Sequence, residues 1–315
     1  MTVFLGFDAG GTKTDCVALD AAGRFLAETT GGAANPLRTG FAKACSALEE
    51  TARRALAEAR EEAENVRAIC AGVAGTGRPR IARRLSSYLT RAFPQASVRV
   101  TTDIEIALEA AIGPIETHGQ GIVIIAGTGS AACGRNSAGK TVRAGGWGPW
   151  VGDPGSAYDI GRRAVAAALR DRDHLGPPTA LGGKILHATE AGDWDALLER
   201  FAKHPDAVFP KLFLVVNETA AGGDAVAQEI LAAAATSLAS LAKAVIDSLG
   251  LPDQSFTLAK SGGVFGHSTY LDAALDRELS RIAPTARIEP LRISPARAAA
   301  ELARKTVSNA AADEA

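Results

Sequence analysis

The segment Asp8-Ala9-Gly10-Gly11-Thr12-Lys13-Thr14 is the most informative part of this 315-residue sequence, and Ala126-Gly127-Thr128-Gly129-Ser130 is similar to it. Each segment follows an apolar run of strand length, Val3 to Phe7 in the first case and Gly121 to Ala126 in the second. Apolar runs joined by glycine turns are typical of β-hairpins. Glycines also let a backbone close round an anion and direct N–H groups at it, and threonine hydroxyls add donors. Each segment is therefore either a plain hairpin turn or a phosphate-binding hairpin.

The surroundings of the two segments match as well. In a register without a gap, Gly11-Thr12 corresponds to Gly127-Thr128, and the turn at residues 20–24 corresponds to the turn at residues 136–140. Later in each half a strand ends in Gly-Val-x-Gly and is followed by a helix and another strand, as at residues 68–75 and 257–266. This order predicts an internal duplication, with a mixed five-stranded sheet flanked by helices in each half.

Glycine, proline and polar residues interrupt the pattern at residues 113–120. We therefore expect an N-terminal domain over residues 1–116 and a larger C-terminal domain over residues 117–315, with the last helix able to pack back on the first domain. A ligand would lie in a cleft between two such domains. The sequence has neither the Walker loop nor the Gly-x-Gly-x-x-Gly pattern of dinucleotide-binding folds, so it does not favour those folds.

The composition excludes several other classes. Hydrophobic residues make up 47% of the chain and charged residues 22%, as in ordinary globular enzymes. The net charge of −1 favours neither nucleic acid nor an anionic membrane as a partner. No leader is expected, because the first residues read as a strand and a glycine turn without a basic segment. No spanning segment is expected either, because threonine, serine and lysine interrupt the alanine-rich helix near residues 230–246. We therefore expect a cytoplasmic protein. No two of the cysteines have zinc or redox spacing; they are Cys16, Cys45, Cys70 and Cys133.

Two aspartates follow predicted strands. Asp8 ends the first strand, where its carboxylate could hold Mg²⁺ through water. Asp103 ends the strand Val98 to Thr102 and begins a helical run from Ile104 to Ala111. It could be the N-cap of that helix, a general base that accepts the proton of an attacking hydroxyl, or both.

Two further glycine-rich segments are candidates for ligand binding. Residues 145–157 read GGWGPWVGDPGSA, and the tryptophans there could pack in a core or offer a flat face to a sugar ring. Asn35 could add amide hydrogen bonds, although Asn-Pro is also a common turn. The glycines of Ser261 to Gly266 could let an adenine or ribose approach the backbone.

Together these segments resemble the N-acetylglucosamine kinase family of the actin–hexokinase–Hsp70 ATPase superfamily. The resemblance rests on DAGGTKT, AAN, TTD, IAGTGS, GGWG, GDPGSA and SGGVFG, in that order between residues 8 and 266. It implies two actin-like (ribonuclease H-like) α/β domains. It also implies a homodimeric kinase that uses ATP and Mg²⁺ to phosphorylate the 6-hydroxyl of an amino sugar, with N-acetyl-D-glucosamine as the first candidate.

The motifs and the resemblance assign roles to individual residues. Asp103 would be the catalytic base, and Asp8 would help to place Mg²⁺, through water. The ATP-binding residues would be Gly10, Gly11, Thr12, Lys13, Gly127, Thr128, Gly129, Ala220, Gly262 and Gly263. The sugar-binding residues would be Asn35, Asp103, Gly145, Gly146, Trp147 and Asp153.

Two departures from the family pattern lie at the predicted sugar site. Pro154 stands where the family usually has glutamate, and Pro36-Leu37 stands where an aromatic residue usually follows the asparagine. The sequence therefore leaves open whether the sugar is acetylated, and a glucosamine kinase is an alternative. Another is an activator ATPase of 2-hydroxyacyl-CoA dehydratases, in which cysteines hold an iron–sulfur cluster, but Cys133 has no companion cysteine in the expected context. A third is a non-catalytic nucleotide switch or sugar-sensing regulator.

Overall fold

The computed structural model describes residues 1–113, 119–291 and 293–313. Its described residues form two compact units, one from residues up to 119 together with those from 291 onward, and one from Gln120–Pro290. We call these unit 1 and unit 2. The boundary predicted between residues 116 and 117 lies outside the described residues. The helix α12 (Pro295–Asp313), which we had assigned to the second domain, belongs to unit 1.

Unit 1 contains a five-stranded sheet in the order β3-β2-β1-β4-β5. The first three strands pair antiparallel, and β4 and β5 continue the sheet in parallel. The strands are β1 (Val3–Ala9), β2 (Lys13–Asp20), β3 (Phe25–Gly32), β4 (Val66–Val73) and β5 (Ser97–Thr101). The helices, besides α12, are α1 (Pro36–Thr39), α2 (Phe41–Ala59), α3 (Pro79–Ala92) and α4 (Asp103–Ile112).

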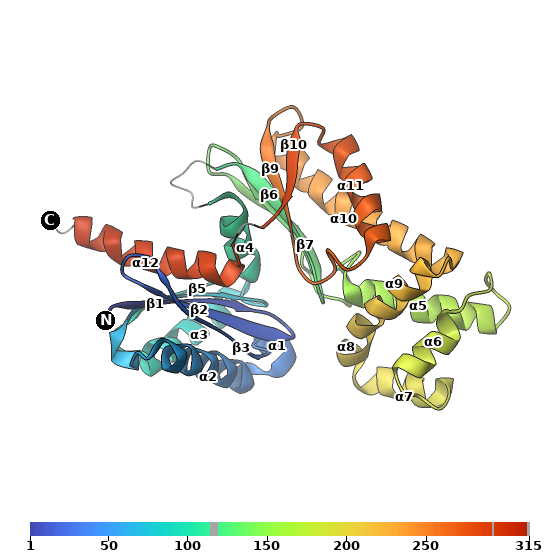
Figure 1. Ribbon diagram of the computed structural model, residues 1–315, viewed down its shortest axis with the longest axis horizontal. Coiled ribbons are helices and arrows are strands. Elements are labelled where there is room, and N and C mark those ends of the chain that lie inside the picture. Colours follow the sequence, from blue (N-terminus) through green and yellow to red (C-terminus); the bar gives the residue numbers. More distant parts are fainter. Residues whose placement is uncertain (114–118, 292, 314–315) are drawn as a thin grey trace. The chain divides into compact units, whose positions relative to one another are not determined.

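Helices cover both faces of this sheet (Figure 1). On one face, apolar side chains of α2 and α3 such as Leu48 and Leu85 pack against Leu5 of β1. On the other face lie α4 and α12. The approach of α12 requires a glycine in β1, because a Cβ on Gly6 would lie 2.0 Å from the backbone nitrogen of Ala300.

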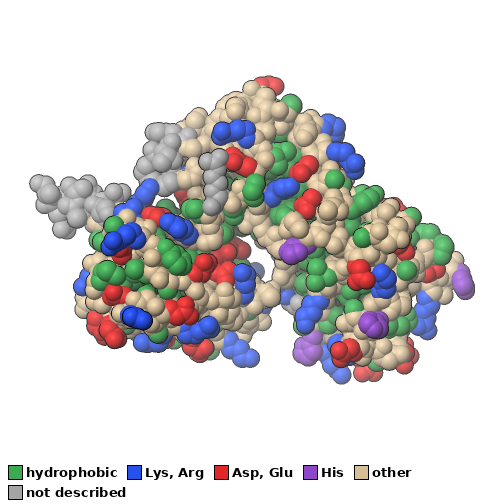
Figure 2. All heavy atoms as spheres, in the orientation of Figure 1, with side chains coloured by type: hydrophobic (Ala, Val, Ile, Leu, Met, Phe, Trp, Pro, Cys, Tyr) green, Lys and Arg blue, Asp and Glu red, His purple; other side chains and the backbone are tan. Residues whose placement is uncertain are grey.

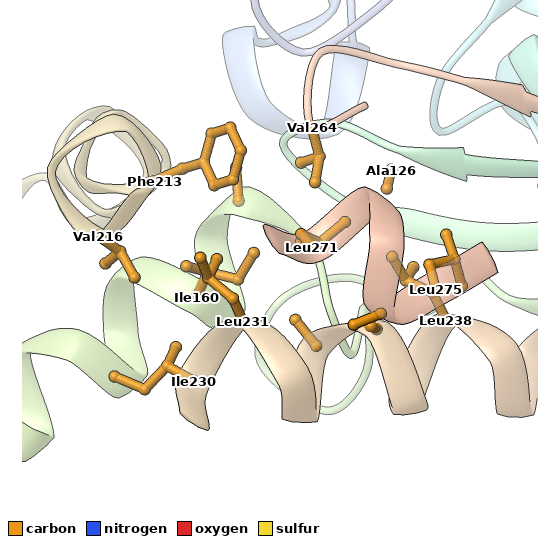
Figure 3. Close-up of a cluster of buried hydrophobic side chains, with 14 of the residues drawn as sticks. Ala126, Ile160, Phe213, Val216, Ile230, Leu231, Leu238, Val264, Leu271 and Leu275 are labelled. Atoms are coloured by element: carbon orange, nitrogen blue, oxygen red, sulfur yellow. The ribbon is translucent and has the colours of Figure 1, made fainter. Parts of the chain in front are cut away.

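Unit 2 repeats this sheet, in the order β10-β9-β6-β7-β8. Its strands are β6 (Gly121–Ala126), β7 (Ser130–Arg135), β8 (Thr141–Gly145), β9 (Phe256–Ser261) and β10 (Ala286–Pro290). Its helices are α5 (Ala157–Arg172), α6 (Leu181–Ala188), α7 (Trp194–Lys203), α8 (Pro205–Val208), α9 (Leu212–Ala221), α10 (Ala225–Leu249) and α11 (Thr269–Ile282). Figure 3 shows part of its core, where Ala126 and Val264 belong to the same buried cluster as Leu238 of α10 and Leu271 of α11.

The predicted fold class is confirmed, and the duplication extends to individual hydrogen bonds. Asp20 Oδ1 accepts from the backbone nitrogens of Ala22 and Arg24, both at 2.9 Å. In unit 2, Asn136 Oδ1 accepts from the nitrogens two and four residues later, at 3.2 and 3.0 Å. The gapless register is wrong on one side of the first turn. Ala9 pairs with Thr14 whereas Ala126 pairs with Ser130, so the turn of unit 1 is one residue longer.

The expectation about membrane-spanning segments also needs correction. Among the described helices, α10 is long and apolar enough to cross a membrane by length and composition. The serine, threonine and lysine within α10 leave its mean hydropathy at 1.5, which is high enough for a spanning helix. Half of its most apolar window is buried inside the structure, and its apolar face, which includes Val226, Leu238 and Leu249, belongs to the core of unit 2. We therefore describe α10 as a core helix.

Charge is mixed over the surface. Figure 2 shows lysine and arginine interspersed with aspartate and glutamate on the face that it draws, in keeping with the net charge of −1.

Candidate active site

The first glycine turn ends the β1–β2 hairpin of unit 1. The backbone nitrogen of Gly10 donates to the carbonyl of Lys13 at 2.9 Å, which closes the turn and leaves Thr12 exposed at its tip. Thr14 is buried and donates its hydroxyl to the carbonyl of Gly32 at 2.7 Å. Thr12 can therefore reach a ligand, whereas Thr14 holds β2 against β3.

Two cationic side chains lie at this turn. Lys13 places its Nζ 2.7 Å from Asp15 Oδ2, so part of its charge is compensated within β2. Arg38 lies against Gly11: a Cβ on this glycine would be 2.8 Å from Arg38 Nη1. Arg38 belongs to no sequence motif and reaches the turn only through the fold, so the sequence alone does not point to it.

Asp8 and Asp103 lie within each other's electrostatic field. The pKa of Asp8 is raised to about 7, mainly by burial and then by the charges of Asp103 and Asp15, against the opposing charge of Lys13. Asp103 is the first residue of α4, and Thr102 caps the helix by accepting from the nitrogen of Glu105 at 3.2 Å. The interpretation of Asp103 as an N-cap is therefore wrong, because the preceding threonine has that function.

Asn35 is anchored beside the first turn. The backbone nitrogen of Ala34 donates to the carbonyl of Gly10 at 3.2 Å. Asn35 Oδ1 accepts from the nitrogen of Leu37 at 3.0 Å and so caps α1. The same Oδ1 atom also lies against Gly75, where a Cβ would be 2.7 Å from it. Unit 1 thus brings Asp8, the glycine turn and Asn35 together.

The second glycine turn ends the β6–β7 hairpin of unit 2. The nitrogen of Gly127 donates to the carbonyl of Gly129 at 2.9 Å. The predicted adenosine motif lies beside it, because the nitrogen of Val264 donates to the carbonyl of Ala126 at 3.0 Å. Gly262 has a φ of 109°, and a Cβ there would lie 2.4 Å from Ala126 O, so only glycine fits this approach. The turn and the motif therefore form one glycine-lined surface.

Asp153 is held against the same turn. It is 6% exposed and has a φ of 56°, a left-handed conformation that is uncommon outside glycine and is often found at functional sites. Its Oδ1 accepts from the nitrogen of Gly148 at 3.2 Å, and its Oδ2 would lie 2.5 Å from a Cβ on Gly129. The nitrogen of Gly146 donates to the carbonyl of Ser130 at 2.9 Å, which ties this glycine-rich loop to β7.

The tryptophans of this loop do not pack in a core. Trp147 and Trp150 are 72% and 81% exposed, so the core-packing alternative is wrong for both. The guanidinium of Arg143 lies 5.2 Å from the ring centroid of Trp147 and helps to orient that ring. Ala220, in contrast, is 2% exposed in the core of unit 2, and its part in adenosine binding stays a prediction.

All four cysteines are buried. Burial raises the pKa of the Cys70 thiol to about 11, and Cys133 is 2% exposed on β7. Thiols in such surroundings do not form the thiolates that bind a cluster at a surface. In the part of the chain that the structure describes, no group of three or more His, Cys, Asp or Glu side chains could hold a metal ion.

Comparison with known proteins agrees with this description. A protein of Clostridium acetobutylicum named N-acetylmuramic acid/N-acetylglucosamine kinase is 33% identical over 273 residues, which cover 86% of this chain and 88% of the relative. The N-acetyl-D-glucosamine kinase of Dictyostelium discoideum is 31% identical over 316 residues, 96% of this chain and 97% of the relative. These relatives confirm the resemblance found in the sequence.

Among solved structures, a Chromobacterium violaceum protein provisionally named N-acetylglucosamine kinase has a TM-score of 0.77 and 24% identity, with 96% of this chain and 99% of that chain covered. At this identity the likeness shows the fold. The model of the BadF/BadG/BcrA/BcrD ATPase family matches residues 5–299, which is nearly the whole chain. The chain therefore belongs to the BadF/BadG/BcrA/BcrD ATPase family.

Proposed function

We propose that this protein is an ATP-dependent kinase that phosphorylates the 6-hydroxyl of an amino sugar, with N-acetyl-D-glucosamine as the preferred substrate. One observation carries the proposal: a glycine turn lies beside a constrained aspartate or asparagine in each unit of a chain that is 31–33% identical to kinases named for this sugar. The fold alone supports many activities, so the proposal rests on these residues.

The two turns would bind the phosphates of the nucleotide. The backbone N–H groups of each turn and the hydroxyls of Thr12 and Thr128 are donors for phosphate oxygens. In phosphoryl transfer most of the catalysis comes from positioning and from stabilising charge on these oxygens. Gly262 and Gly263 lie beside the second turn, where they would leave room for the ribose or the base.

Asp103 would accept the proton of the sugar 6-hydroxyl as its oxygen attacks the γ-phosphorus and the bond to the leaving ADP breaks. Its place in the first turn of α4 suits this role, because the helix dipole favours a negative charge there. Asp153, the backbone of Gly145 and Gly146, and the exposed face of Trp147 would bind the sugar ring. Asn35 would contribute from unit 1.

Asp8 would hold Mg²⁺ through water. The residues fit this ion, because burial and two nearby carboxylates raise the pKa of Asp8, and a cation would relieve both effects. Magnesium usually takes one or two carboxylates together with phosphate oxygens and several waters, so it does not require a cage of protein ligands. When bound, it would neutralise charge on the phosphates.

Residues of the proposed sugar site bear on which amino sugar binds. At Pro154, the backbone carbonyl accepts the Ser130 hydroxyl at 2.8 Å, and the proline side chain offers no polar group to a sugar. The Clostridium relative is named for N-acetylmuramic acid as well as N-acetylglucosamine. Glucosamine and N-acetylmuramic acid are therefore the alternative substrates to compare.

A coupled ADP-release assay tests the proposal. N-acetylglucosamine, N-acetylmuramic acid, glucosamine, glucose and N-acetylmannosamine are each supplied with Mg-ATP, and one reaction contains no sugar. We expect ADP release to depend on N-acetylglucosamine and the product to carry phosphate on its 6-oxygen. ATP hydrolysis at the same rate without sugar would instead indicate a nucleotide switch. We also propose that the protein is a cytoplasmic homodimer. Light scattering measures the mass of the purified protein in solution and so tests whether it is a dimer.

A further inference from the structure

We infer that Arg38 binds the terminal phosphate of the bound nucleotide, as a phosphate-binding side chain additional to the two threonines. The inference deepens the proposed function, since it concerns the same nucleotide site. It begins from a contact: Arg38 lies over the turn of the first hairpin, and a Cβ on Gly11 would be 2.8 Å from its Nη1 and 3.2 Å from its Cδ. The absence of a side chain at Gly11 is what allows the guanidinium to approach.

The segment that carries Arg38 is fixed to this turn. The nitrogen of Ala34 donates to the carbonyl of Gly10 at 3.2 Å, immediately before α1 begins. Asn35 then caps α1, and the nitrogen of Arg38 donates to the carbonyl of Asn35 at 3.0 Å. The turn and the backbone of Arg38 are therefore held together before any nucleotide binds, which reduces the ordering cost of binding.

The charges at this turn favour a cation with this geometry. Asp8, Asp15 and Asp103 place negative charge near it, and Lys13 is paired with Asp15 at 2.7 Å. A polyphosphate brings further negative charge to the same place. A guanidinium keeps its charge at every relevant pH and can donate two parallel hydrogen bonds to phosphate oxygens.

The corresponding turn of unit 2 has the opposite charge against its glycine. There the side chain that occupies the space beside Gly129 is the carboxylate of Asp153, whose Oδ2 would be 2.5 Å from a Cβ. A carboxylate suits sugar hydroxyls, which donate hydrogen bonds, and repels phosphate oxygens. Both turns close a β-hairpin, but they differ in the side chain that covers them, and this difference assigns the terminal phosphate to the turn with Arg38.

Nucleotide titrations test this inference without a sugar. Binding of ADP and of AMP-PNP, which has a third phosphate, is measured by calorimetry in the presence of Mg²⁺ for wild type, Arg38→Gln and Arg38→Lys. We expect Arg38→Gln to weaken AMP-PNP binding by roughly tenfold to a hundredfold, the range for a charge-assisted hydrogen bond, and ADP binding by less than about threefold. Arg38→Lys should recover part of the difference.

Two further variants control this experiment. Arg83→Gln removes an exposed arginine from α3 of the same unit and should leave both affinities unchanged. Gly11→Ala keeps Arg38 but directs a methyl group at its guanidinium, and it should reproduce the selective loss of AMP-PNP binding. If Arg38→Gln does not fold, as judged from its thermal melt, Gly11→Ala and Arg38→Lys still test the inference.

Equal losses for ADP and AMP-PNP, or no loss for either, would overturn the inference. So would unchanged AMP-PNP binding combined with a raised KM for N-acetylmuramic acid, because the guanidinium would then contact the carboxylate of a sugar. The proposed function fails in a different experiment, when no sugar stimulates ADP release. The two failures can therefore be told apart.

Discussion

A methyl group on Gly129 would test the role of Asp153 without altering the carboxylate itself. In the Gly129→Ala variant the new Cβ would lie 2.5 Å from Asp153 Oδ2 and 3.2 Å from its Cγ, which is too close for either atom. Gly129 is not among the glycines with positive φ, so alanine can adopt its backbone conformation. The strain would therefore fall on the carboxylate, which must move away from the turn.

The expected effect follows from how Asp153 is held. Its carboxylate is buried, it accepts from the nitrogen of Gly148, and its backbone has a φ of 56°, so it has little room to readjust. A hydrogen bond to a charged group contributes about 1.5–3 kcal/mol. Since each 1.4 kcal/mol corresponds to a factor of ten, loss of one such bond to the sugar would raise its KM by roughly 10–150-fold.

Steady-state kinetics with N-acetylglucosamine at saturating ATP would measure this change, and calorimetry with ADP would show whether the nucleotide site is intact. Gly183→Ala is a matched control in the same unit, because a Cβ there has no atom within 4 Å. We expect its sugar KM to equal that of wild type. If Gly129→Ala also keeps the wild-type sugar KM, the assignment of Asp153 to sugar binding is refuted.

Four other predictions follow from the same structure. Asp103→Asn should lower turnover by roughly 10²–10⁴-fold and keep the affinity for AMP-PNP. Glu105→Gln, a change at an exposed position of the same helix, should keep the wild-type turnover. Equal turnover in the two variants would contradict the role of Asp103 as base. In metal-free buffer Asp8→Asn should melt several degrees above wild type at pH 8. The pKa of Asp8 is raised from 3.8 to about 7 in the folded protein, so wild type loses stability as the pH rises through this window. The difference in melting temperature between the two proteins should therefore vanish near pH 4. A difference that grew on acidification would contradict the raised pKa. Gly6→Ala should destabilise unit 1 by about 1–3 kcal/mol or more in denaturant titrations, because its Cβ meets the backbone of α12, whereas Gly32→Ala has open space and should not. EDTA should abolish turnover and leave the melting temperature of the nucleotide-free protein unchanged, and a lower melting temperature would point to a structural metal instead.

Much of the fold could be predicted from local patterns. The helix that follows the second Gly-Val-x-Gly segment is observed as α11 (Thr269–Ile282), and its start is readable locally because Ser268 caps it. The hairpins were predictable because glycine turns separate short apolar strands. The extra residue in the first turn was not, since Gly10 and Gly11 are equally good turn residues and only the strand pairing distinguishes them.

The site was predictable only where motifs carry it. Asp103 and its neighbour Thr102 are both good caps, and the sequence alone does not show which of them faces the first turn of α4. Arg38 contacts Gly11 across 27 positions of sequence, and no periodicity reports such a contact. Trp147 is exposed in a loop where the glycines at residues 145, 146 and 148 have positive φ, and a glycine-rich segment does not reveal from its sequence which way such a ring points.

The packing of α12 on β1 also bears on how the chain matures on the ribosome. Ala296 and Ala300, which cover Gly6, are made about 290 residues after it. At 5–20 residues per second this delay is roughly 15–60 s, during which one face of the sheet lacks its covering helix. The contiguous segment Gln120–Pro290 can complete its own sheet within that interval. A nascent chain arrested before α12 should therefore remain a client of chaperones that bind exposed apolar strands.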